Sequence, residues 1–523
     1  MPDEKIHVEE KGHSFFSRIG LENFKAFGER QGVLFRPITL LYGKNSSGKS
    51  SFIQSLLFLQ ELSRGSLSPD VHEIKRHSLT LGGFDRFIHK RQGGILAFEL
   101  SLDLEDDLGK VTIRLEIQRS GHQRAVILDR IFIRDSKKDD NLVSLKYKND
   151  GRYELEFGED CPFVSNENIS ELKGFFLCVV TENNLIPDRV VTNREKEQTD
   201  VSRDARLKLE NFLQKVSRLL LNFLDRMSYL CGNRDVAEQG VLDGAGTGLQ
   251  GGQAGGLQYW EELRKDNLLR NRVNQYLGLL FEDRYQIVEE RFFSSSIAAK
   301  IAANMQEDFG GILDDDLESG DDIPGGGDFY DEEPSDRSSM ENSKGGQRSF
   351  QDIVQDELDK DVTQSQRNEI RILDNLTGLR MLPNELGFGI GQVIPIVAAA
   401  CLPGRTVIVE QPETHLHPKQ QADLGEILAS SMALQEGGGE GSTFIIETHS
   451  IHILERLGKI IRETSKGRDF KGLRLKSEEV GVYYVDAEES SSVKLRRMEL
   501  RDDGKLKRKW PGEFFNEDMN DLF

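Results

Sequence analysis

A run of small residues around two glycines and a lysine lies near the N-terminus and has the composition of an anion-binding loop. It reads GKNSSGKS from Gly43 and fits the pattern GxxxxGK[ST] at every fixed position. Small residues allow successive backbone N–H groups to turn inward, and the first turn of a following helix adds partial positive charge. We therefore predict a phosphate-binding loop made by Gly43, Lys44, Asn45, Ser46, Ser47, Gly48, Lys49, Ser50 and Ser51.

The segments on either side of this loop support that interpretation. Residues 38–42 are apolar and predict a strand before the loop, and residues 50–62 predict a helix after it. In this context Lys49 is expected to reach the β- and γ-phosphates of a nucleotide, and the Ser50 hydroxyl is expected to bind Mg²⁺. The predicted cofactors are therefore ATP and Mg²⁺.

Two further apolar stretches, both near the C-terminus, end in polar residues. Residues 406–410 end at Glu410, and residues 443–447 are followed by Thr448 and His449. A carboxylate at a strand end beside a phosphate loop can hold Mg²⁺ directly or through water. A histidine at such a place can donate a hydrogen bond to a γ-phosphate, although a purely structural role is the alternative. We predict Glu410 as a metal ligand and His449 as the γ-phosphate contact.

Four motifs, taken in order, resemble those of the ABC-type AAA ATPases of bacteria, which are relatives of RecF, SMC heads and the OLD nucleases. They are GKNSSGKSS, GFGIGQVIPIV, EQPETHLHP and ETHS, and the resemblance covers about residues 15–135 and 375–523. It implies an α/β fold, a P-loop NTPase of the ABC-ATPase head type, with an antiparallel β-subdomain and a large, mostly helical insertion. Residues 480–523, with the motif WPGEFF, resemble an uncharacterised C-terminal domain found on many such ATPases.

The resemblance also implies a second copy of the chain as a partner. Residues 387–392 would be the signature motif, in which Gly389, Gly391 and Gln392 contact the ATP held by the phosphate loop of the other copy. Two chains would then enclose two ATP molecules, with His449 as the switch. The family commonly has serine where this chain has Gly391, so one hydroxyl contact to the γ-phosphate is missing here.

A second departure concerns the group that acts on the attacking water. In the family's arrangement, Glu410 takes the Mg²⁺ position and Gln411 occupies the place of the catalytic glutamate. A carboxamide cannot accept a proton at neutral pH, but it can orient a water molecule. Glu413 offers a carboxylate if the turn after Pro412 brings it near. We therefore expect slow hydrolysis, with Gln411 and Glu413 as alternatives for this role.

These residues must be positioned by elements from both ends of the chain. Alternating apolar residues predict strands at 17–24, 32–41, 95–104, 111–118 and 125–134, and a hairpin at 144–157. Helical spacing of apolar residues predicts helices at 207–230 and 259–281. The expected parts are an N-terminal ATPase lobe (1–143), an insertion (144–369), a C-terminal ATPase lobe (370–479) and a small C-terminal domain (480–523).

The insertion contains two segments of biased composition. Residues 240–256 include eight glycines and predict a mobile loop. Residues 305–348 are rich in Asp, Glu, Gly and Ser, and 307–337 hold 13 acidic residues against one basic residue. Such a segment cannot bury enough apolar surface to fold, so we expect a disordered spacer, with a nucleic-acid mimic or an autoinhibitory segment as the alternatives.

Overall composition favours a cytoplasmic protein without a membrane segment. The net charge is −21, of which −12 falls in 307–337, so a basic groove for DNA elsewhere stays open. Cys161, Cys178, Cys231 and Cys401 are widely spaced, as expected in a reducing compartment. No run of 18 or more apolar residues is present, and the N-terminus lacks the apolar core of a secretory signal.

Two functions fit these features. The first is a slow ATPase that senses a trigger and controls a separate effector, similar to the ATPase subunits of the Septu and PARIS anti-phage systems. The second is a DNA-binding repair or maintenance ATPase similar to RecF. We expect no nuclease in this chain, because the 74 residues after His449 lack the length and paired acids of a Toprim domain. The sequence names neither the trigger nor the effector.

Overall fold

The computed structural model describes most of the chain outside a few segments. The described residues are 16–63, 84–91, 94–104, 108–119, 126–148, 151–159, 161–165, 168–169, 172, 176–181, 184–192, 200–232, 234, 256–293, 366–433, 441–487, 492–511 and 514–515. The expected spacer at 305–348 and nearly all of the expected glycine-rich loop at 240–256 lie outside them. Two compact units are present, one made of Met1–Ile287 with Ile372–Phe523 and the other of Val288–Arg371.

The largest element of the first unit is a nine-stranded antiparallel sheet in the order β10-β9-β8-β7-β6-β5-β4-β1-β2. Burial alternates clearly along β5, where Val111, Ile113, Leu115 and Ile117 are buried and the residues between them are partly exposed. The strands are β1 (Phe16–Glu22), β2 (Gln31–Leu34), β4 (Leu96–Asp103), β5 (Lys110–Arg119), β6 (Val126–Asp135), β7 (Asn141–Tyr147), β8 (Arg152–Phe157), β9 (Phe176–Val179) and β10 (Arg189–Thr192).

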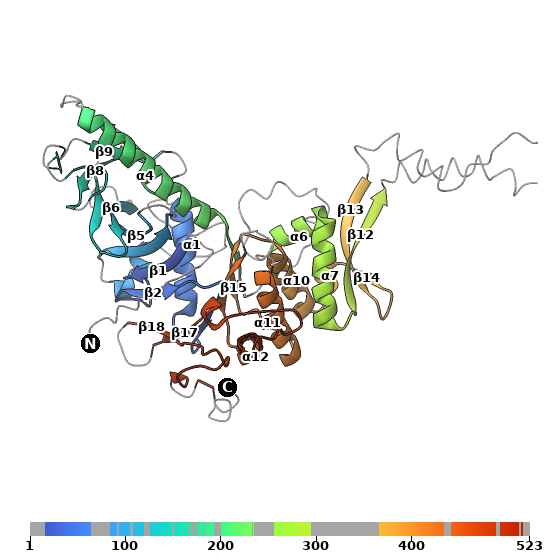
Figure 1. Cartoon of the computed structure of the whole chain (residues 1–523). Helices are drawn as coiled ribbons and strands as arrows, with labels where there is room; N and C mark the ends of the chain where they lie inside the picture. The colour runs from blue at the N-terminus through green and yellow to red at the C-terminus, as the bar shows by residue number, and fades with distance from the viewer. Residues whose placement is uncertain are drawn as a thin grey trace, which may run out of the picture. The chain divides into compact units, whose positions relative to one another are not determined.

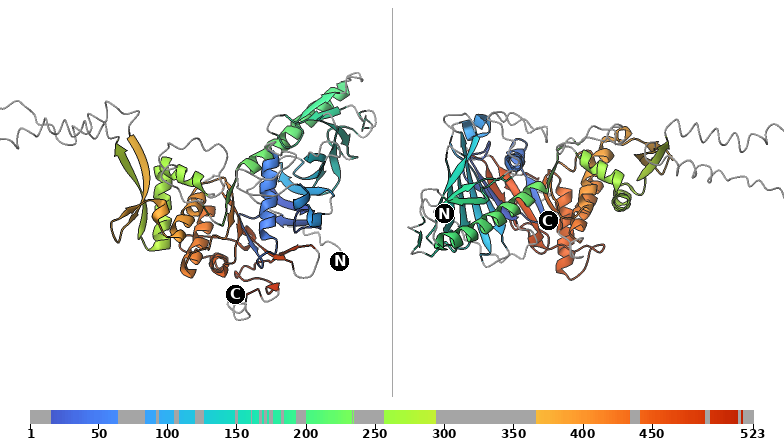
Figure 2. Two further views of the ribbon diagram at one scale, coloured as in Figure 1. Left: turned by 180° about the vertical axis from the view of Figure 1, so that it is seen from behind. Right: turned by 90° about the horizontal axis from the view of Figure 1, so that it is seen from above.

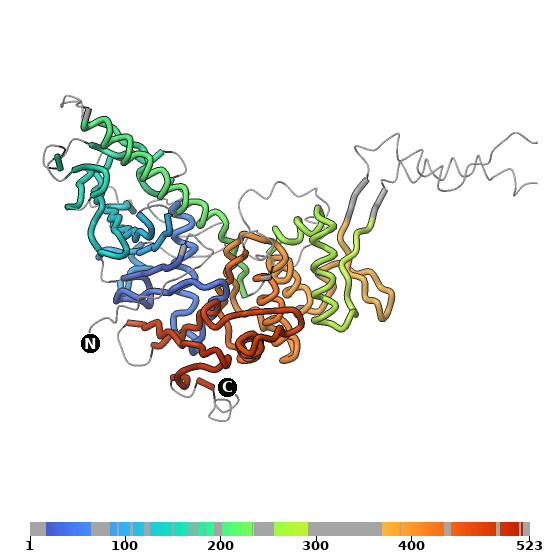
Figure 3. The backbone as a smooth tube through the Cα atoms, in the orientation of Figure 1, coloured from blue at the N-terminus to red at the C-terminus, as the bar shows by residue number. Residues whose placement is uncertain are grey.

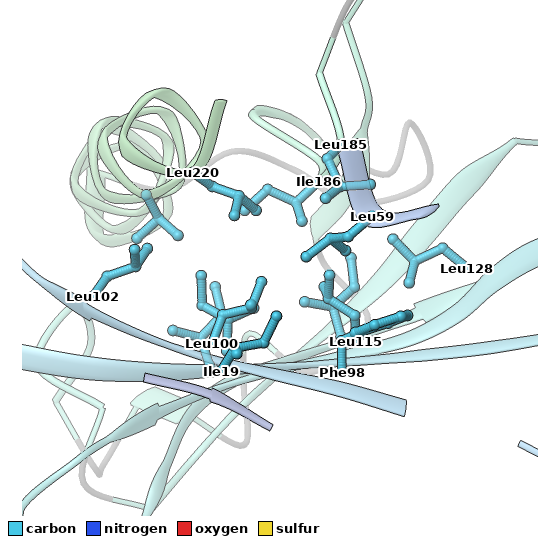
Figure 4. Packing of buried hydrophobic residues seen from close by; sticks show 14 of the residues in the cluster. Ile19, Leu59, Phe98, Leu100, Leu102, Leu115, Leu128, Leu185, Ile186 and Leu220 are labelled. Carbon is cyan, nitrogen blue, oxygen red and sulfur yellow. The ribbon is translucent and has the colours of Figure 1, made fainter. Parts of the chain in front are cut away.

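Two helices cover the apolar face of this sheet. They are α1 (Lys49–Ser63), which follows the phosphate loop, and α4 (Asp200–Asp225), which lies along the sheet (Figures 1 and 2). Figure 4 shows Phe98 and Leu115 of the sheet pointing toward Leu59 of α1, and Leu100 toward Leu220 of α4. Burial of these side chains fixes α1, and with it the loop at its N-terminus, against the sheet.

A six-stranded sheet carries the predicted nucleotide-binding residues, and its strands are in the order β11-β15-β16-β3-β17-β18. The first five strands are parallel and β18 pairs antiparallel with β17. Figure 3 shows β3, in blue, next to β17, in red, although they come from opposite ends of the chain. The strands are β3 (Ile38–Tyr42), β11 (Met227–Leu230), β15 (Thr406–Glu410), β16 (Thr443–Glu447), β17 (Val480–Asp486) and β18 (Lys494–Arg497).

The two predicted middle helices differ from the observed ones. Helix α4 ends at Asp225, and the last residues of the predicted segment form β11, because they pair with the apolar strand β15. The segment predicted at 259–281 is two helices, since the Asp266 carboxylate accepts hydrogen bonds from the N–H groups of Leu268 and Leu269 and starts a new helix. The remaining long helices are α6 (Leu257–Lys265), α7 (Asn267–Phe281), α10 (Phe388–Cys401), α11 (Pro418–Ala433) and α12 (Ile451–Ser465).

A third sheet and four short helices make up the remaining described elements. A three-stranded sheet has the order β12-β13-β14. The elements are α2 (Phe84–Phe87), η2 (His89–Arg91), η3 (Pro383–Glu385), η4 (Ser477–Glu479), β12 (Tyr285–Phe293), β13 (Gln366–Asp374) and β14 (Arg380–Met381).

Both sheets extend across boundaries that were expected between parts of the chain. The expected boundary between residues 143 and 144 falls inside β7, and β8 to β10 continue the same nine-stranded sheet. The expected boundary between 479 and 480 falls directly before β17, which pairs with the phosphate-loop strand. The four cysteines, all among the described residues, form no disulfide, and Cys231 is partly exposed while the other three are buried. Within the described part of the chain, no helix has both the length and the apolar character required to cross a membrane.

Candidate nucleotide-binding site

The phosphate loop has a backbone that requires glycine at two of its fixed positions. Gly43 and Gly48 have φ angles of 154° and 109°, which side chains with a Cβ atom rarely adopt. A Cβ atom on Gly43 would also lie 2.6 Å from the Ser47 hydroxyl and 2.7 Å from the Val485 carbonyl. The loop is therefore tightly folded between the end of β3 and the start of α1, with its backbone close to β17.

Lys49 lies inside this loop and is only 4% exposed. Its ammonium group donates hydrogen bonds to the carbonyls of Gly43 (2.8 Å) and Lys44 (3.0 Å). Burial lowers the pKa of Lys49, while the carboxylates of Glu447 and Glu413 act in the opposite direction. The predicted phosphate-binding lysine is thus held where the loop closes, facing acidic groups from the C-terminal part of the chain.

Glu447, the last residue of β16, is the carboxylate next to the loop. The Ser50 hydroxyl lies 3.1 Å from its Oε2 and 3.4 Å from its Oε1, and Lys49 Nζ lies 3.9 Å from Oε1. Burial, and then the negative charge of Glu410, raises the pKa of Glu447 to about 7. The interpretation of the sequence did not assign this residue a role. The available signal was an acid at the end of each of two apolar strands.

Glu410, the predicted metal ligand, ends the neighbouring strand β15 and contacts a different set of groups. Its carboxylate accepts hydrogen bonds from the Tyr229 hydroxyl and the Gly232 N–H, and its backbone carbonyl accepts one from Arg234 at 2.6 Å. Burial raises its pKa, and these hydrogen bonds act to lower it. The contacts of Glu410 therefore come from β11 and the residues after it. This set was not found from sequence, because β11 was predicted as helix.

Gln411 follows at a strained backbone position. Its φ angle is 44°, in the left-handed region that residues other than glycine seldom occupy. The Gln411 N–H donates to the carbonyl of Glu447 at 2.7 Å, and the Thr414 hydroxyl donates to the Gln411 carbonyl at 2.9 Å. The backbone at Gln411 is thus fixed by hydrogen bonds to Glu447 at the end of β16 and to Thr414 in the turn that follows.

Glu413 connects this turn to the turn that carries His449. Its Oε2 accepts a hydrogen bond from the Thr448 hydroxyl and its Oε1 accepts one from the His449 N–H, both at 2.7 Å. Both carboxylate oxygens therefore bond the loop between β16 and α12. The Tyr42 hydroxyl, at the end of β3, donates to the Ser450 carbonyl at 2.8 Å and fixes the other side of the same loop.

Two buried polar atoms at the site have no hydrogen-bond partner among the described residues. They are Nε2 of His449 and the hydroxyl oxygen of Ser47. Burial and the charge of Lys49 lower the pKa of His449, which favours the neutral ring. Buried polar atoms are nearly always hydrogen-bonded. These two atoms therefore fit a site in which a bound ligand supplies oxygen atoms as hydrogen-bond partners. The phosphates of a nucleotide supply such oxygens.

The predicted signature motif begins helix α10. Gly387 is its N-cap, and a Cβ atom on Gly389 would lie 2.5 Å from the His415 carbonyl, so the helix start packs against the turn after β15. His417 caps the next helix, because its Nδ1 accepts from the Lys419 N–H at 3.4 Å. Gly391 and Gln392 are buried, and Gly389 is partly exposed. The described residues include no group of three or more His, Cys, Asp or Glu side chains that could hold a metal ion.

Aromatic side chains of the C-terminal segment contact the same region. The ring of Trp510 lies 5.0 Å from that of Tyr42, and the ring of Phe514 lies 6.2 Å from that of His449, measured between centroids. Phe514 also lies 5.3 Å from Tyr484 of β17. The aromatic residues Trp510, Phe514 and Phe515 thus pack against Tyr42 at the end of β3, a placement that the sequence did not indicate.

Comparison with known proteins identifies two family matches. A model described as "AAA domain, putative AbiEii toxin, Type IV TA system" matches residues 38–157 and 257–455, which together are more than half of the chain. A second, described as a protein of unknown function (DUF3696), matches residues 475–523. No curated protein matches the chain.

Solved structures with weak similarity include three SMC heads. The SMC head domain from Thermotoga maritima has 10% identity and a TM-score of 0.36, and covers 93% of this chain and 99% of its own. A SmcHead bound to the C-winged helix domain of ScpA has 9% identity and a TM-score of 0.41. The match covers 93% of this chain and 98% of that chain. The Smc head domain with an extended coiled coil, bound to the C-terminal domain of ScpA and derived from Pyrococcus furiosus, has 9% sequence identity and a TM-score of 0.37. The match covers 93% of this chain and 96% of that chain.

Proposed function

The chain belongs to the family described as "AAA domain, putative AbiEii toxin, Type IV TA system", and we propose that it is a slow, ATP-gated switch that controls a separate effector protein. The observation that carries this proposal is the turn at Thr448 and His449. Glu413 ties this turn to the end of the acidic strand, while Nε2 of His449 has no hydrogen-bond partner among the described residues. A turn held in this way can respond when its histidine gains or loses a phosphate contact.

Different groups of the chain bind different parts of ATP. The N–H groups of the phosphate loop and the ammonium of Lys49 bind phosphate oxygens, and His449 donates to the γ-phosphate. Mg²⁺, when bound, neutralises phosphate charge, and the Ser50 hydroxyl and the acidic strand ends are the groups that hold it. Lys49 is already beside the carbonyls of Gly43 and Lys44, so its charge is in place before the substrate arrives.

Slow turnover follows from the groups around the expected position of the attacking water. Gln411 has no basic carboxylate, and both oxygens of Glu413 accept hydrogen bonds from the Thr448–His449 turn. A water molecule that approaches Glu413 must compete with these hydrogen bonds, which limits its activation by this carboxylate. The chain therefore remains ATP-bound for a long time, which suits a device that must hold or release a partner.

Closure of two chains around ATP is part of the proposal, with Gly389, Gly391 and Gln392 of one copy facing the phosphate loop of the other. We infer a role in bacterial anti-phage defence, because the matching family is described by a putative toxin of a toxin–antitoxin system. The effector is a separately encoded protein. DNA binding in the manner of RecF stays the alternative function, and it predicts salt-dependent binding of duplex DNA by the ATP-bound protein.

Crosslinking between two differently labelled chains tests this proposal. One chain carries Asn45→Cys in the exposed part of the phosphate loop, and the other carries Glu385→Cys just before α10. Mixed in equal amounts with a short bifunctional maleimide, they should give a heterodimer only with ATP and Mg²⁺. Adding Lys49→Ala to both chains serves as the control and should abolish the crosslink. Absence of the heterodimer in ATP, in chains that still bind ATP, would rule out the face-to-face closure.

A further inference from the structure

The carboxylates that end β15 and β16 are not equivalent with respect to the phosphate loop. We propose that Glu447, rather than Glu410, is the protein carboxylate that binds Mg²⁺ directly, beside the hydroxyl of Ser50. This inference rests on the proposed ATP site, but it is independent of the switch role and of the dimer.

The order of the strands places Glu447 one strand nearer to the loop. Strand β16 lies between β15 and β3, and Glu447 pairs in register with Glu410 on one side and with Leu41 on the other. Residues in register on adjacent parallel strands point to the same face of a sheet, and adjacent strands are ~4.8 Å apart. Both carboxylates therefore face the same side, and Glu410 must reach across an additional strand to approach Ser50.

The contacts of the two carboxylates lead to the same assignment. Glu447 contacts the Ser50 hydroxyl and the Lys49 ammonium, which are the groups expected to bind metal and phosphate. The carboxylate of Glu410 instead accepts hydrogen bonds from Tyr229 and Gly232 on the opposite side. Moving Glu410 to a metal beside Ser50 would break these hydrogen bonds, whereas Glu447 is already adjacent to Ser50.

The distance between the two oxygens also fits a shared ion. Mg²⁺ binds oxygen ligands at about 2.0–2.1 Å in octahedral geometry, so two neighbouring ligand oxygens are separated by roughly 2.9 Å. The Ser50 hydroxyl and Oε2 of Glu447 are 3.1 Å apart. These oxygens can become neighbouring ligands of one ion with very little movement. A purely structural hydrogen bond between them would predict no effect of Glu447 on metal affinity.

Metal affinity, measured without relying on turnover, tests this assignment. Mn²⁺ is titrated into the full chain with a non-hydrolysable ATP analogue, and free Mn²⁺ is followed by electron paramagnetic resonance. Glu447→Gln should weaken Mn²⁺ binding by about tenfold or more, as loss of one charged ligand contact implies. Glu410→Gln should have a smaller effect, and Glu447→Asp should recover part of the affinity. Binding of the analogue in EDTA should stay within about threefold of wild type for all three variants.

Each outcome separates this inference from the proposed function. If the wild type does not bind the analogue, the nucleotide site itself is wrong and the inference fails with it. If the wild type binds Mn²⁺ and analogue but Glu447→Gln is within twofold of it, or Glu410→Gln loses more, only the assignment of Glu447 is overturned. If Glu447→Gln is destabilised, Glu447→Asp replaces it in the same titration. Ser50→Ala, alone and combined with the Glu447 variant, completes a double-mutant cycle. The two changes should be non-additive, because they remove ligands of the same ion.

Discussion

The two large sheets bury their side chains in different ways. In the nine-stranded antiparallel sheet, β5 alternates buried and partly exposed residues, so only one face packs against helices. In the six-stranded sheet, every residue of β3 and of β17 is buried. A parallel strand enclosed on both faces leaves its ends as the places where polar side chains meet. The carboxyl ends of β3, β15 and β16 carry the phosphate loop, Glu410 and Glu447.

This difference separates the residues that control stability from those that control binding. Apolar side chains of the antiparallel sheet pack in one cluster with α1 and α4, and this cluster also includes Leu41, Ile408 and Ile445 of the six-stranded sheet. Removing a side chain of the antiparallel sheet far from the phosphate loop should therefore lower the free energy of unfolding much more than it changes nucleotide affinity. Removing a polar side chain at the end of a parallel strand should weaken nucleotide binding and change the free energy of unfolding little. The following variants test this division.

The largest effect is expected at Lys49. Lys49→Ala removes the cation that faces the β- and γ-phosphates, so ATP binding should weaken several-fold or more and hydrolysis should stop. Lys419→Ala, which removes an exposed lysine paired with Glu282, is the matched control and should leave both unchanged. Isothermal titration calorimetry and phosphate release measure the two quantities. Normal hydrolysis by Lys49→Ala would remove the assignment of the loop.

The next effect is on stability and lies in the antiparallel sheet. Ile113→Ala leaves a cavity in the buried face of β5 and should cost about 2–5 kcal/mol of unfolding free energy. Thr112→Ala, on the opposite face of the same strand, should cost less than about 1 kcal/mol. Urea unfolding gives these values, and the ATP dissociation constant should be unchanged in both variants. A tenfold weaker ATP affinity in folded Ile113→Ala would show that a cavity in β5 disturbs the phosphate loop through the cluster that the two sheets share.

A smaller effect is expected from Gln411→Glu, which places a carboxylate beside the site. Wild-type hydrolysis should be near intrinsic small-GTPase rates, about 10⁻⁴ to 10⁻² per second, and the variant should be about tenfold faster. If Glu413 already acts as the base, Gln411→Glu should change little and Glu413→Gln should stop turnover. Steady-state phosphate release distinguishes these alternatives. Wild-type turnover of tens per second that is insensitive to Glu413→Gln would contradict both.

The smallest effect is expected from deleting residues 305–348. Their composition, with 13 acidic residues against one basic residue in 307–337, predicts no contribution to a packed core. The deleted chain should melt within about 2 °C of the full chain and bind ATP equally well. Differential scanning fluorimetry with and without ATP measures both. A large decrease in melting temperature would show that the segment packs against one of the sheets.

Local patterns in the sequence were sufficient for the loop and for the strands beside it. The strand predicted at 32–41 is instead two strands, β2 and β3, because the chain leaves the antiparallel sheet after Leu34 and enters the parallel sheet at Ile38. Residues 38–42 directly before the loop, 406–410 and 443–447 were predicted as strands with the bounds that β3, β15 and β16 have. These segments combine β-branched or apolar runs with clear ends, so no tertiary information was needed.

Features that depend on pairing between distant segments were not predictable in this way. Residues 227–230 continue the helical spacing of the preceding segment and become β11 only because β15 offers a strand partner. The proximity of Glu447 to Ser50 depends on the order of β15, β16 and β3, which one sequence does not reveal. For the same reason, the packing of Phe514 against His449 was not foreseen.

The position of β3 between β16 and β17 has a consequence for the synthesis of the protein. Ile38 pairs with Phe444 on one side and with Val480 on the other. Both edges of β3 therefore remain unpaired until strands about 400 residues later in the chain have been synthesised. Domains generally fold as units while the chain emerges from its N-terminus, and unpaired strand edges invite aggregation. A ribosome-bound fragment that ends before β16 therefore carries the complete phosphate-loop sequence without the strands that shape it. Nucleotide binding by the nascent chain should begin only after β17 has been synthesised.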